Sequence, residues 1–581
     1  MGFITPTPPP FEIEEWERRG HLERIKPLAQ DWAINGFGTP WGVYVLYILK
    51  LIVYVLVAAL VISATTDLGG LGNFTEWWSD PIVFQKLAVY TLLWEFIGLG
   101  AGSMPLTFRF KPMIGGILYW LRPGGIRLPP FPDRVPGTAG NTRTMLDVAL
   151  AAGVILSALY LLIDGESSPV FGHLEALPIA ALLGLLGLLG LRDKVSFLAA
   201  RPEVYAFLLI VFMFPLENFA VGSQLVLFFI WWGAASSKLN KHFPFVVSVM
   251  ISNTPWNRSR KLKSQLYRDH PDDLIPSWRA AFAAHSGTVI EFTLPLILIL
   301  TNGGLFGTLA VIGMLIFHTH ITSTFPLAVP LEWNLFMMFG ILVLFGEYGD
   351  VPLSTLDQPL LIALLVLVGI VMPVLGNFRP DKVSFLPGMR YYAGNWATSQ
   401  WLFRGNAENR LDQCITKAAP IVPRQLEEFY DPGLVQVLLY KGLAFRSMHS
   451  HGRALNGLTM RAVDDVTDYT VREGELVSGV CNGWNFGDGH FHNEQLLEAV
   501  QERCGFEEGE VRIVTLESQP VGKPWQRYKI VDAKVGVIEE GTVLVADMVE
   551  RQPWLDGHAG EFPVTVERDN RPAPEPGATT R

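Results

Sequence analysis

Long apolar runs alternate with short charged segments between residues 41 and 376, and the pattern changes after that point. Several runs reach roughly 15–20 residues, which is long enough for a helix to cross most of a bilayer. The pattern predicts about ten crossings, or eight if the short hairpin interrupted at Pro215 does not span. We expect these spans at residues 41–63, 82–104, 145–163, 176–191, 204–215, 220–237, 282–300, 306–323, 333–346 and 359–375.

The charged residues in the intervening loops sort by sign along the chain. The loops at 105–144, 192–201 and 253–279 are rich in Arg and Lys, whereas those at 64–81 and 347–357 carry mainly acids. Because basic loops are retained on the cytoplasmic side, the alternation predicts a multi-pass protein of the plasma (inner) membrane with both termini in the cytoplasm. The start of the chain is proline-rich and charged, so we expect no signal peptide.

Outside the spans the chain divides into three further regions. Residues 1–40 are predicted to be an amphipathic arm at the membrane surface, because apolar residues such as Trp16 and Ile25 alternate with charges. Residues 377–565 show short alternating runs and predict a cytosolic α+β domain. Residues 566–581 are predicted to be a disordered tail. The predicted fold class is therefore mainly α: a polytopic helical membrane bundle over residues 41–376 with a C-terminal cytosolic α+β domain.

Within the C-terminal domain the alternation predicts particular elements. We expect strands at 510–517, 527–537 and 541–549, with the sequence Glu-Glu-Gly at 539–541 as a turn. The amphipathic pattern at 493–504 predicts a helix, for which Asn493 is a suitable N-cap.

Composition agrees with a membrane protein. Of 581 residues, 50% are hydrophobic and 17% are charged, and the mean hydropathy of +0.29 is not that of a soluble chain. The three cysteines, Cys414, Cys481 and Cys504, all follow the last apolar run, and their spacing matches no metal motif. We interpret them as free thiols in a reducing compartment.

Lys238 ends the apolar segment Leu225–Asn240, LVLFFIWWGAASSKLN. A lysine in this position has two interpretations. It either extends to the lipid head groups, or it points into the protein and takes part in proton chemistry.

Ionisable residues within the predicted spans are few, and burying a charge costs several kcal/mol unless it is paired. We therefore expect them to meet in a pocket. The predicted catalytic residues are Lys238, His318, His320, Glu95 and Glu291, and the predicted substrate-binding residues are His285, Glu332 and Asn240.

Several of these residues have a structural alternative. His318 and His320 lie about 200° apart on a helix, so we expect at most one of them to face the pocket unless the helix ends between them. Either one is equally compatible with polar contacts between helices. Glu332 lies near the start of a span, where a carboxylate also suits the helix dipole.

The C-terminal domain contains two His-x-His pairs, His449/His451 and His490/His492. Residues two apart on a strand share a face, so each pair is able to hold a metal, with Asp488 as an available carboxylate. The alternative is a polar, glycine-containing loop. No Walker loop, dinucleotide-binding fingerprint or nucleophile elbow is present.

The segment Phe228–Asn240, FFIWWGAASSKLN, resembles the membrane domain shared by vitamin K-dependent γ-carboxylases and their bacterial relatives, the HTTM group. Their aromatic-rich helix runs into a Lys-Leu-Asn or Lys-Leu-Asp ending. The segment FHTHITSTFPLAVP at 317–330 is similar to their histidine-bearing helix and proline-rich turn. The resemblance implies that Lys238 is the base in quinol-driven chemistry. Over its full length the chain resembles an uncharacterised actinobacterial, mycobacterial-type family of transmembrane proteins.

Two hypotheses follow for the function. The first is a membrane-embedded enzyme that acts on a lipid, a quinone or a membrane-delivered substrate. The second is a lipid-handling, transport or scaffold component of a cell-envelope membrane complex. We expect a quinone or bound lipid as cofactor, membrane lipids and a membrane or cytosolic protein as partners, and no nucleic acid.

Overall fold

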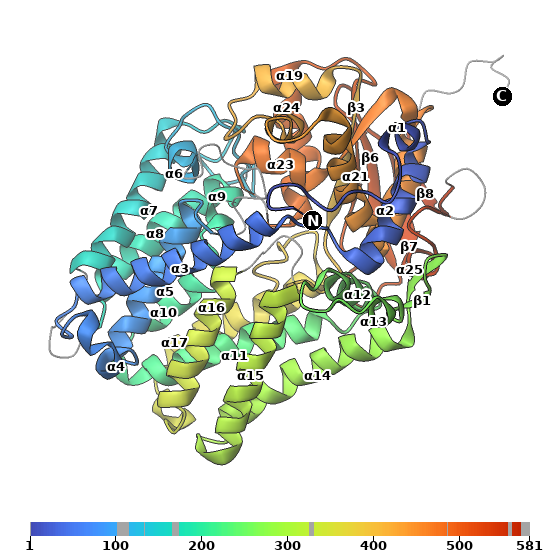
Figure 1. The fold of residues 1–581 in the computed structure, drawn as a ribbon. Coiled ribbons are helices and arrows are strands. Elements are labelled where there is room, and N and C mark those ends of the chain that lie inside the picture. The colour runs from blue at the N-terminus through green and yellow to red at the C-terminus, as the bar shows by residue number, and fades with distance from the viewer. Residues whose placement is uncertain are drawn as a thin grey trace, which may run out of the picture.

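A computed structural model of the chain describes residues 2–100, 115–132, 134–164, 173–324, 331–484, 486–555 and 561–570. The molecule has two parts, a helical bundle and a C-terminal domain built on a sheet (Figure 1). The predicted combination of a mainly helical chain with a C-terminal sheet region is confirmed.

The bundle contains most of the apolar runs as helices. Among the described residues, six helices are long and apolar enough to cross a membrane: Trp41–Ala64, Met145–Asp164, Leu216–Ser237, Trp278–Leu300, Gly304–Thr324 and Pro359–Phe378. Their large apolar side chains remain exposed, as on α3, where Ile48 and Leu49 are more than half exposed. The helices of the bundle are α3 (Trp41–Ala64), α5 (Pro81–Phe96), α7 (Met145–Asp164), α8 (Ala176–Arg192), α10 (Tyr205–Phe212), α11 (Phe219–Ser237), α14 (Trp278–Leu300), α15 (Gly304–Thr324), α16 (Leu331–Gly340), α17 (Pro359–Val366) and α18 (Met372–Phe378).

Two of these helices contain wider turns. A π-helical segment, Ile341–Glu347, continues α16, and another, Leu367–Val371, joins α17 to α18. Short elements complete this part of the chain: α4 (Phe74–Trp77), α6 (Gly115–Trp120), α9 (Lys194–Ala199), α12 (Phe243–Asn253), α13 (Arg260–Ser264) and the antiparallel pair β1 (Tyr267–Asp269) and β2 (Asp273–Pro276).

The C-terminal domain is organised on a six-stranded antiparallel sheet of order β4-β3-β5-β6-β7-β8. Its strands are β3 (Thr398–Arg404), β4 (Tyr469–Glu473), β5 (Val511–Leu516), β6 (Trp525–Asp532), β7 (Gly536–Leu544) and β8 (Thr565–Asp569). Apolar residues on both faces of the sheet are buried, because helices cover both sides (Figure 1).

Alternate residues of the central strands enter two different cores. Leu402 and Val514 join one cluster with the helices α21 (Pro432–Met448) and α22 (Ser450–Ala462), whereas Trp401 and Ile513 join another with α23 (Gly474–Asn482) and α24 (Glu494–Cys504). This is the period of two expected for a strand. The remaining helices are α19 (Ala407–Cys414), α20 (Val422–Leu426) and α25 (Val545–Glu550).

The predicted elements of this domain are only partly right. The helix α24 is confirmed, and the Asn493 side chain accepts from the backbone N–H of Gln495 as its N-cap. The turn expected at 539–541 is wrong, because these residues lie within β7 at a register shift opposite β8. Gly541 is needed there because a Cβ would meet the Thr565 carbonyl. The last predicted strand stops early and continues as α25.

Two predictions about the ends of the chain are corrected. The N-terminal arm forms α1 (Ile13–Glu17) and α2 (His21–Asn35), but its apolar face packs on α21 rather than on lipid, so that Trp16 and Trp32 are buried. The predicted disorder of the tail from residue 566 is wrong for its first residues, because the strand β8 extends to Asp569. The residues beyond 570 lie outside the described part.

The bundle and the C-terminal domain share one hydrophobic core, which includes residues of α5, α11, β3 and α24. All three basic loops contact this domain in their described parts. The Tyr119 hydroxyl donates to the Cys481 carbonyl at 2.8 Å, and Lys194 donates to the Gln495 side chain at 2.8 Å. In the third loop, the N–H of Leu274 donates to Gln552 at 2.8 Å. The basic loops therefore lie on the same side as the C-terminal domain.

Candidate functional site

A cavity of about 170 Å³ lies between α11, α12, α14 and α15 and extends to the C-terminal domain. Its walls are mostly apolar. They include four of the predicted site residues, Lys238, Glu291, His318 and His320, together with Arg201, Ile230, Trp231, Ala234, Phe243, Val247, Met250, Ile251, Ala283, Ala284, Gly287, Phe317, Ile321, Thr324, Trp333, Tyr391, Tyr392 and Phe486.

Lys238 points into the protein. It lies at the C-terminal end of α11, where its side chain is nine per cent exposed, and its Nζ is 2.5 Å from Oε2 of Glu291 on α14. Glu291 is itself buried. The ring of Phe243 lies 5.6 Å from the ammonium group. The structure therefore shows the inward orientation of this lysine, and its part in proton chemistry stays a prediction.

Asn240 accounts for the position of Lys238. Its amide nitrogen donates to the carbonyls of Ser237 and Ala393, and its oxygen accepts from the N–H groups of His242 and Phe243. These bonds hold the sharp connection from α11 to α12. Asn240 does not line the cavity, so the structure gives it a positioning role rather than the predicted contact with substrate.

His318 is fixed by two hydrogen bonds. The indole N–H of Trp231 donates to Nε2 at 3.0 Å, and Nδ1 lies 2.8 Å from the amide oxygen of Asn334. Because an indole nitrogen only donates, the proton of the neutral imidazole is on Nδ1. Both ring nitrogens are therefore occupied, and His318 is held in one orientation in the cavity wall.

His320 lines the same cavity, which corrects the prediction that only one of the two histidines would. Residues 317, 318, 320, 321 and 324 of α15 all contribute to the wall. The lining residues cover one side of the helix, an arc of about 160° around its axis. His318 and His320 lie at the two edges of this arc. His320 is the exposed edge, and its ring lies 6.2 Å from that of Trp256.

Glu95 and Glu332 do not line the cavity. Glu332 lies in the first turn of α16, as the helix dipole favours, and its Oε1 is 3.3 Å from Nζ of Lys50 and 3.4 Å from Nε1 of Trp94. Glu95 is buried at the end of α5, next to Gly100, where a Cβ would collide with its carboxylate. Glu332 belongs to a polar group with Lys50 and Trp94, and sequence reasoning missed this lysine.

His285 is the fourth predicted residue that does not line the cavity. It is exposed on α14 and is absent from the cavity wall. On that helix Glu291 faces inward, whereas His285 is six residues away and turned outward.

Arg201 is a functional candidate that the sequence did not reveal, because it was counted as a loop charge. It is buried, its Nε is 2.7 Å from Oε1 of Glu203, and its guanidinium lies 4.4 Å from the ring of Phe486. Its Nη1 and the indole Nε1 of Trp333 have no hydrogen-bond partner among the described residues. Both donors belong to residues of the cavity wall but are themselves buried, without surface on the cavity.

The first His-x-His pair of the C-terminal domain lies at the junction of α21 and α22, not on a strand. His449 Nδ1 lies 2.8 Å from the carbonyl of Phe445, and His451 Nε2 lies 3.2 Å from the guanidinium of Arg446. Burial, together with the nearby charge of Arg446, holds the pKa of His449 at about 3 and that of His451 well below its usual value. A metal cation at this pair would face a buried arginine.

The second pair is divided between two environments. His490 lies between two carboxylates, with Nδ1 3.0 Å from Asp488 and Nε2 3.0 Å from Glu517. Despite its burial, these two charges raise the pKa of His490 to about 10. His492 instead lies 2.5 Å from the hydroxyl of Ser399. Among the described residues, no group of three His, Cys, Asp or Glu side chains is arranged to hold a metal.

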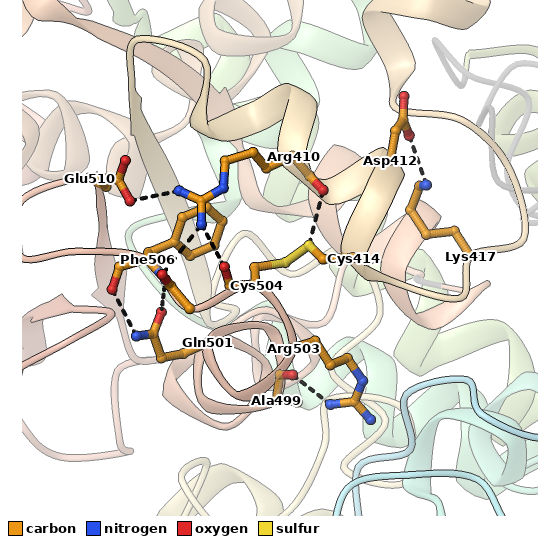
Figure 2. The surroundings of a disulfide bond; sticks show 11 residues. Arg410, Asp412, Cys414, Lys417, Ala499, Gln501, Arg503, Cys504, Phe506 and Glu510 are labelled. Atoms are coloured by element: carbon orange, nitrogen blue, oxygen red, sulfur yellow. Dashed lines mark hydrogen bonds and ion pairs between the residues drawn. A yellow bond between two sulfur atoms is a disulfide. The ribbon is translucent and has the colours of Figure 1, made fainter.

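The prediction of three free thiols is wrong. Cys414 on α19 and Cys504 on α24 form a disulfide, which joins positions 90 residues apart because the fold packs these two helices together. Figure 2 shows the bond beside Arg410, which bridges Glu510 at 2.8 Å and the Cys504 carbonyl at 2.6 Å. Cys481 is free and buried, and burial raises its pKa to about 12. The cysteines therefore do not indicate a reducing compartment.

Comparison with known proteins assigns the chain to a family. No curated protein matches the chain, and no solved structure matches it. The family described as transmembrane protein of unknown function (DUF3556) matches residues 1–567, which include both the cavity and the C-terminal sheet. The chain is therefore a member of this DUF3556 family of transmembrane proteins.

Proposed function

We propose that the protein is a membrane-embedded enzyme that binds an apolar, membrane-soluble molecule in the cavity and exchanges a proton with it through Lys238 and Glu291. The observation that carries the proposal is the buried pair itself, with 2.5 Å between Nζ and Oε2 in an otherwise mostly apolar wall. Replacing a buried ion pair by apolar residues is often neutral or stabilising, so stability alone is a weak reason to retain it.

The pair provides a simple route for a proton. The ammonium group of Lys238 is a donor, and its amine becomes a base once its proton has passed to Glu291. His320 is suited to carry protons between this pair and the exterior, because it lies at the exposed edge of the wall. His318 is a positioning residue in this scheme, since both of its nitrogens are already bonded.

The lining also indicates what the substrate looks like. A cavity of about 150 Å³ is enough for a benzene ring, so about 170 Å³ accommodates a ring or a comparable part of a lipid. The buried guanidinium group of Arg201 adds a positive charge to this lining, which favours an oxygen acceptor on that group. We propose a quinone or an oxygen-bearing lipid, in agreement with the resemblance of the Lys238 segment to the HTTM group.

The first experiment identifies what occupies the cavity. Gly287 lines it and has open space around its missing Cβ, so the side chain of Gly287→Leu should extend into the cavity. Gly187 on α8 has equally open surroundings outside the cavity, and Gly187→Leu is the matched control. We expect an organic extract of purified protein to contain a quinone or lipid that is lost in Gly287→Leu and retained in Gly187→Leu, as measured by mass spectrometry.

The second step tests catalysis. The extracted molecule is supplied to wild type and to Lys238→Met in proteoliposomes, and its conversion is followed by mass spectrometry. Conversion by wild type and loss of conversion in a folded Lys238→Met protein are expected. If both proteins convert it equally, Lys238 is not the base.

A non-enzymatic function is the alternative, and the mostly apolar lining favours it. A cavity that only holds a lipid needs shape and apolar surface, which the lining residues supply. In that case the extracted molecule would bind wild type unchanged, and the protein would act as a lipid-handling, transport or scaffold component of a cell-envelope complex.

We further propose that the protein resides in the plasma membrane with its C-terminal domain in the cytoplasm. The contact of all three basic loops with this domain supports a single positive side.

A further inference from the structure

A second, polar cavity of about 340 Å³ lies where α2, the start of α3 and the loop after α12 meet. It differs from the first in its charge. Among the described residues, its lining contains three cations, Arg258, Arg260 and Lys263, and no Asp or Glu. Neither arginine has a hydrogen bond or ion pair to its guanidinium group within the described part of the chain.

Lys263 is the buried member of this group. Its Nζ donates to the carbonyls of Ser252 at 2.5 Å and Thr254 at 3.4 Å, where the C-terminus of α12 offsets part of its charge. No carboxylate of the described residues forms an ion pair with it, in contrast to Lys238, which has Glu291. Burial accordingly lowers the pKa of Lys263. A buried cation without a counterion is costly, and an anion in the cavity would remove that cost.

The position of the cavity indicates where this anion comes from. Trp41, at the start of α3, belongs to the lining and is partly exposed. Trp256 and Trp278 lie close by in sequence, at the same basic loop and at the start of α14, and both are more than half exposed. Exposed tryptophans at the ends of spanning helices are typical of the membrane–water interface. These tryptophans support a position of the cavity at the depth of the lipid phosphates, with the spanning helices in a bilayer.

We propose that the cavity at Arg258, Arg260 and Lys263 binds a phosphate group. Two arginines and a lysine are suited to a phosphate, because guanidinium groups bind its oxygens in pairs and the ammonium adds a point charge. A phospholipid head group and a soluble phosphate ester share this chemistry, and the interfacial position favours the lipid. The site is independent of the function proposed for the first cavity.

The test uses the full-length protein in detergent. Arg258 and Arg260 are exposed, so the double variant Arg258→Gln/Arg260→Gln should fold normally. Lys261 lies beside Arg260 on α13, is exposed and does not line the cavity, which makes Lys261→Gln the matched control. One arm adds phosphatidylglycerol to delipidated protein, a second adds glycerol 3-phosphate, and native mass spectrometry counts the bound molecules.

We expect one retained phosphatidylglycerol on wild type and on Lys261→Gln, with binding at least about tenfold weaker in the double variant. Binding of glycerol 3-phosphate with the same variant dependence would assign the site to a soluble ester. The proposal is overturned if neither compound binds, or if Lys261→Gln loses binding as much as the double variant.

Discussion

Nζ of Lys238 and Oε2 of Glu291 are 2.5 Å apart, although the two residues are 53 positions apart and belong to different helices. Both side chains are almost completely buried. The charge on either one is therefore compensated mainly by the other. This relationship determines how the protein should respond when one partner is removed.

Removing one partner should be much more harmful than removing both. Lys238→Met leaves a buried carboxylate and Glu291→Leu leaves a buried ammonium, and breaking a buried pair in this way costs about 3–5 kcal/mol. The double variant Lys238→Met/Glu291→Leu contains no charge and should recover most of the loss. Thermal unfolding in detergent measures all four proteins. Additive losses in the double variant would show that the two charges do not depend on each other.

A substantial part of this site could be predicted from the sequence. Ionisable residues are rare within spanning helices. Lys238, at the end of one apolar run, and Glu291, within another, could therefore be recognised as candidate site residues. The pairing itself could not be predicted, because it depends on the contact between α11 and α14. Arg201 lines the cavity although it belongs to a loop. The periodicity of the sequence does not distinguish this arginine from the other charged residues in loops.

Other predictions failed because an assumed local structure was wrong. The metal prediction treats the His-x-His pairs as strand residues, whereas His449 lies between α21 and α22 and His490 lies in a 3-10 turn, Gly489–Phe491. The prediction that at most one histidine of α15 faces the pocket assumes that the pocket contacts one narrow side of the helix. The cavity instead contacts a wide arc of α15, which includes both histidines. The free-thiol prediction rested on spacing, which says nothing about two helices that pack together in three dimensions.

The orientation of the C-terminal domain is open to a direct test. The basic loops that contact it predict the cytoplasmic side, whereas a disulfide in the same domain is more common on an oxidising side. We expect the charge distribution of the loops to determine the side on which the domain lies, because these charges act during membrane insertion. A green fluorescent protein fused to the C-terminus should fluoresce, and alkaline phosphatase fused at the same point should be inactive. The reverse pattern would place the domain outside.

The disulfide predicts a specific count of thiols. Of the three cysteines, Cys414 and Cys504 are bonded and Cys481 is free. Unfolding without reductant should therefore expose one reactive thiol per chain, rising to three after reduction, and Cys481→Ser should show none before reduction. A thiol-reactive dye in denaturant provides the measurement. Three thiols before reduction would mean that the bond does not form in the purified protein.

The same bond should stabilise the C-terminal domain. It joins positions 90 residues apart, and closing a loop of that length removes about 4–5 kcal/mol of unfolded-state entropy in the chain-entropy model. Cys414→Ser/Cys504→Ser should therefore unfold at a lower temperature than wild type. Cys481→Ser is the control for loss of a thiol outside the bond. Equal melting temperatures for the double variant and wild type would remove this role.

His490 predicts a pH dependence of stability at alkaline pH. Asp488 and Glu517 raise its pKa to about 10 in the folded protein, against about 6.5 in the unfolded chain. Because the folded pKa is the higher one, this contribution is complete below pH 6.5 and is lost as the pH rises towards 10, by about 1.4 kcal/mol per pH unit. The two carboxylates have the opposite sign: their pKa values are lowered, so their contribution is lost in acid.

The measurement is the melting temperature of wild type and His490→Gln between pH 6 and pH 10. Wild type should lose stability steadily over this range, whereas His490→Gln should lack that decline, because glutamine does not titrate. Since Glu517 is also bonded to the Ser518 N–H, its side chain should keep its place in the variant. Parallel curves for the two proteins would show that His490 does not carry the charge that its two carboxylate partners favour.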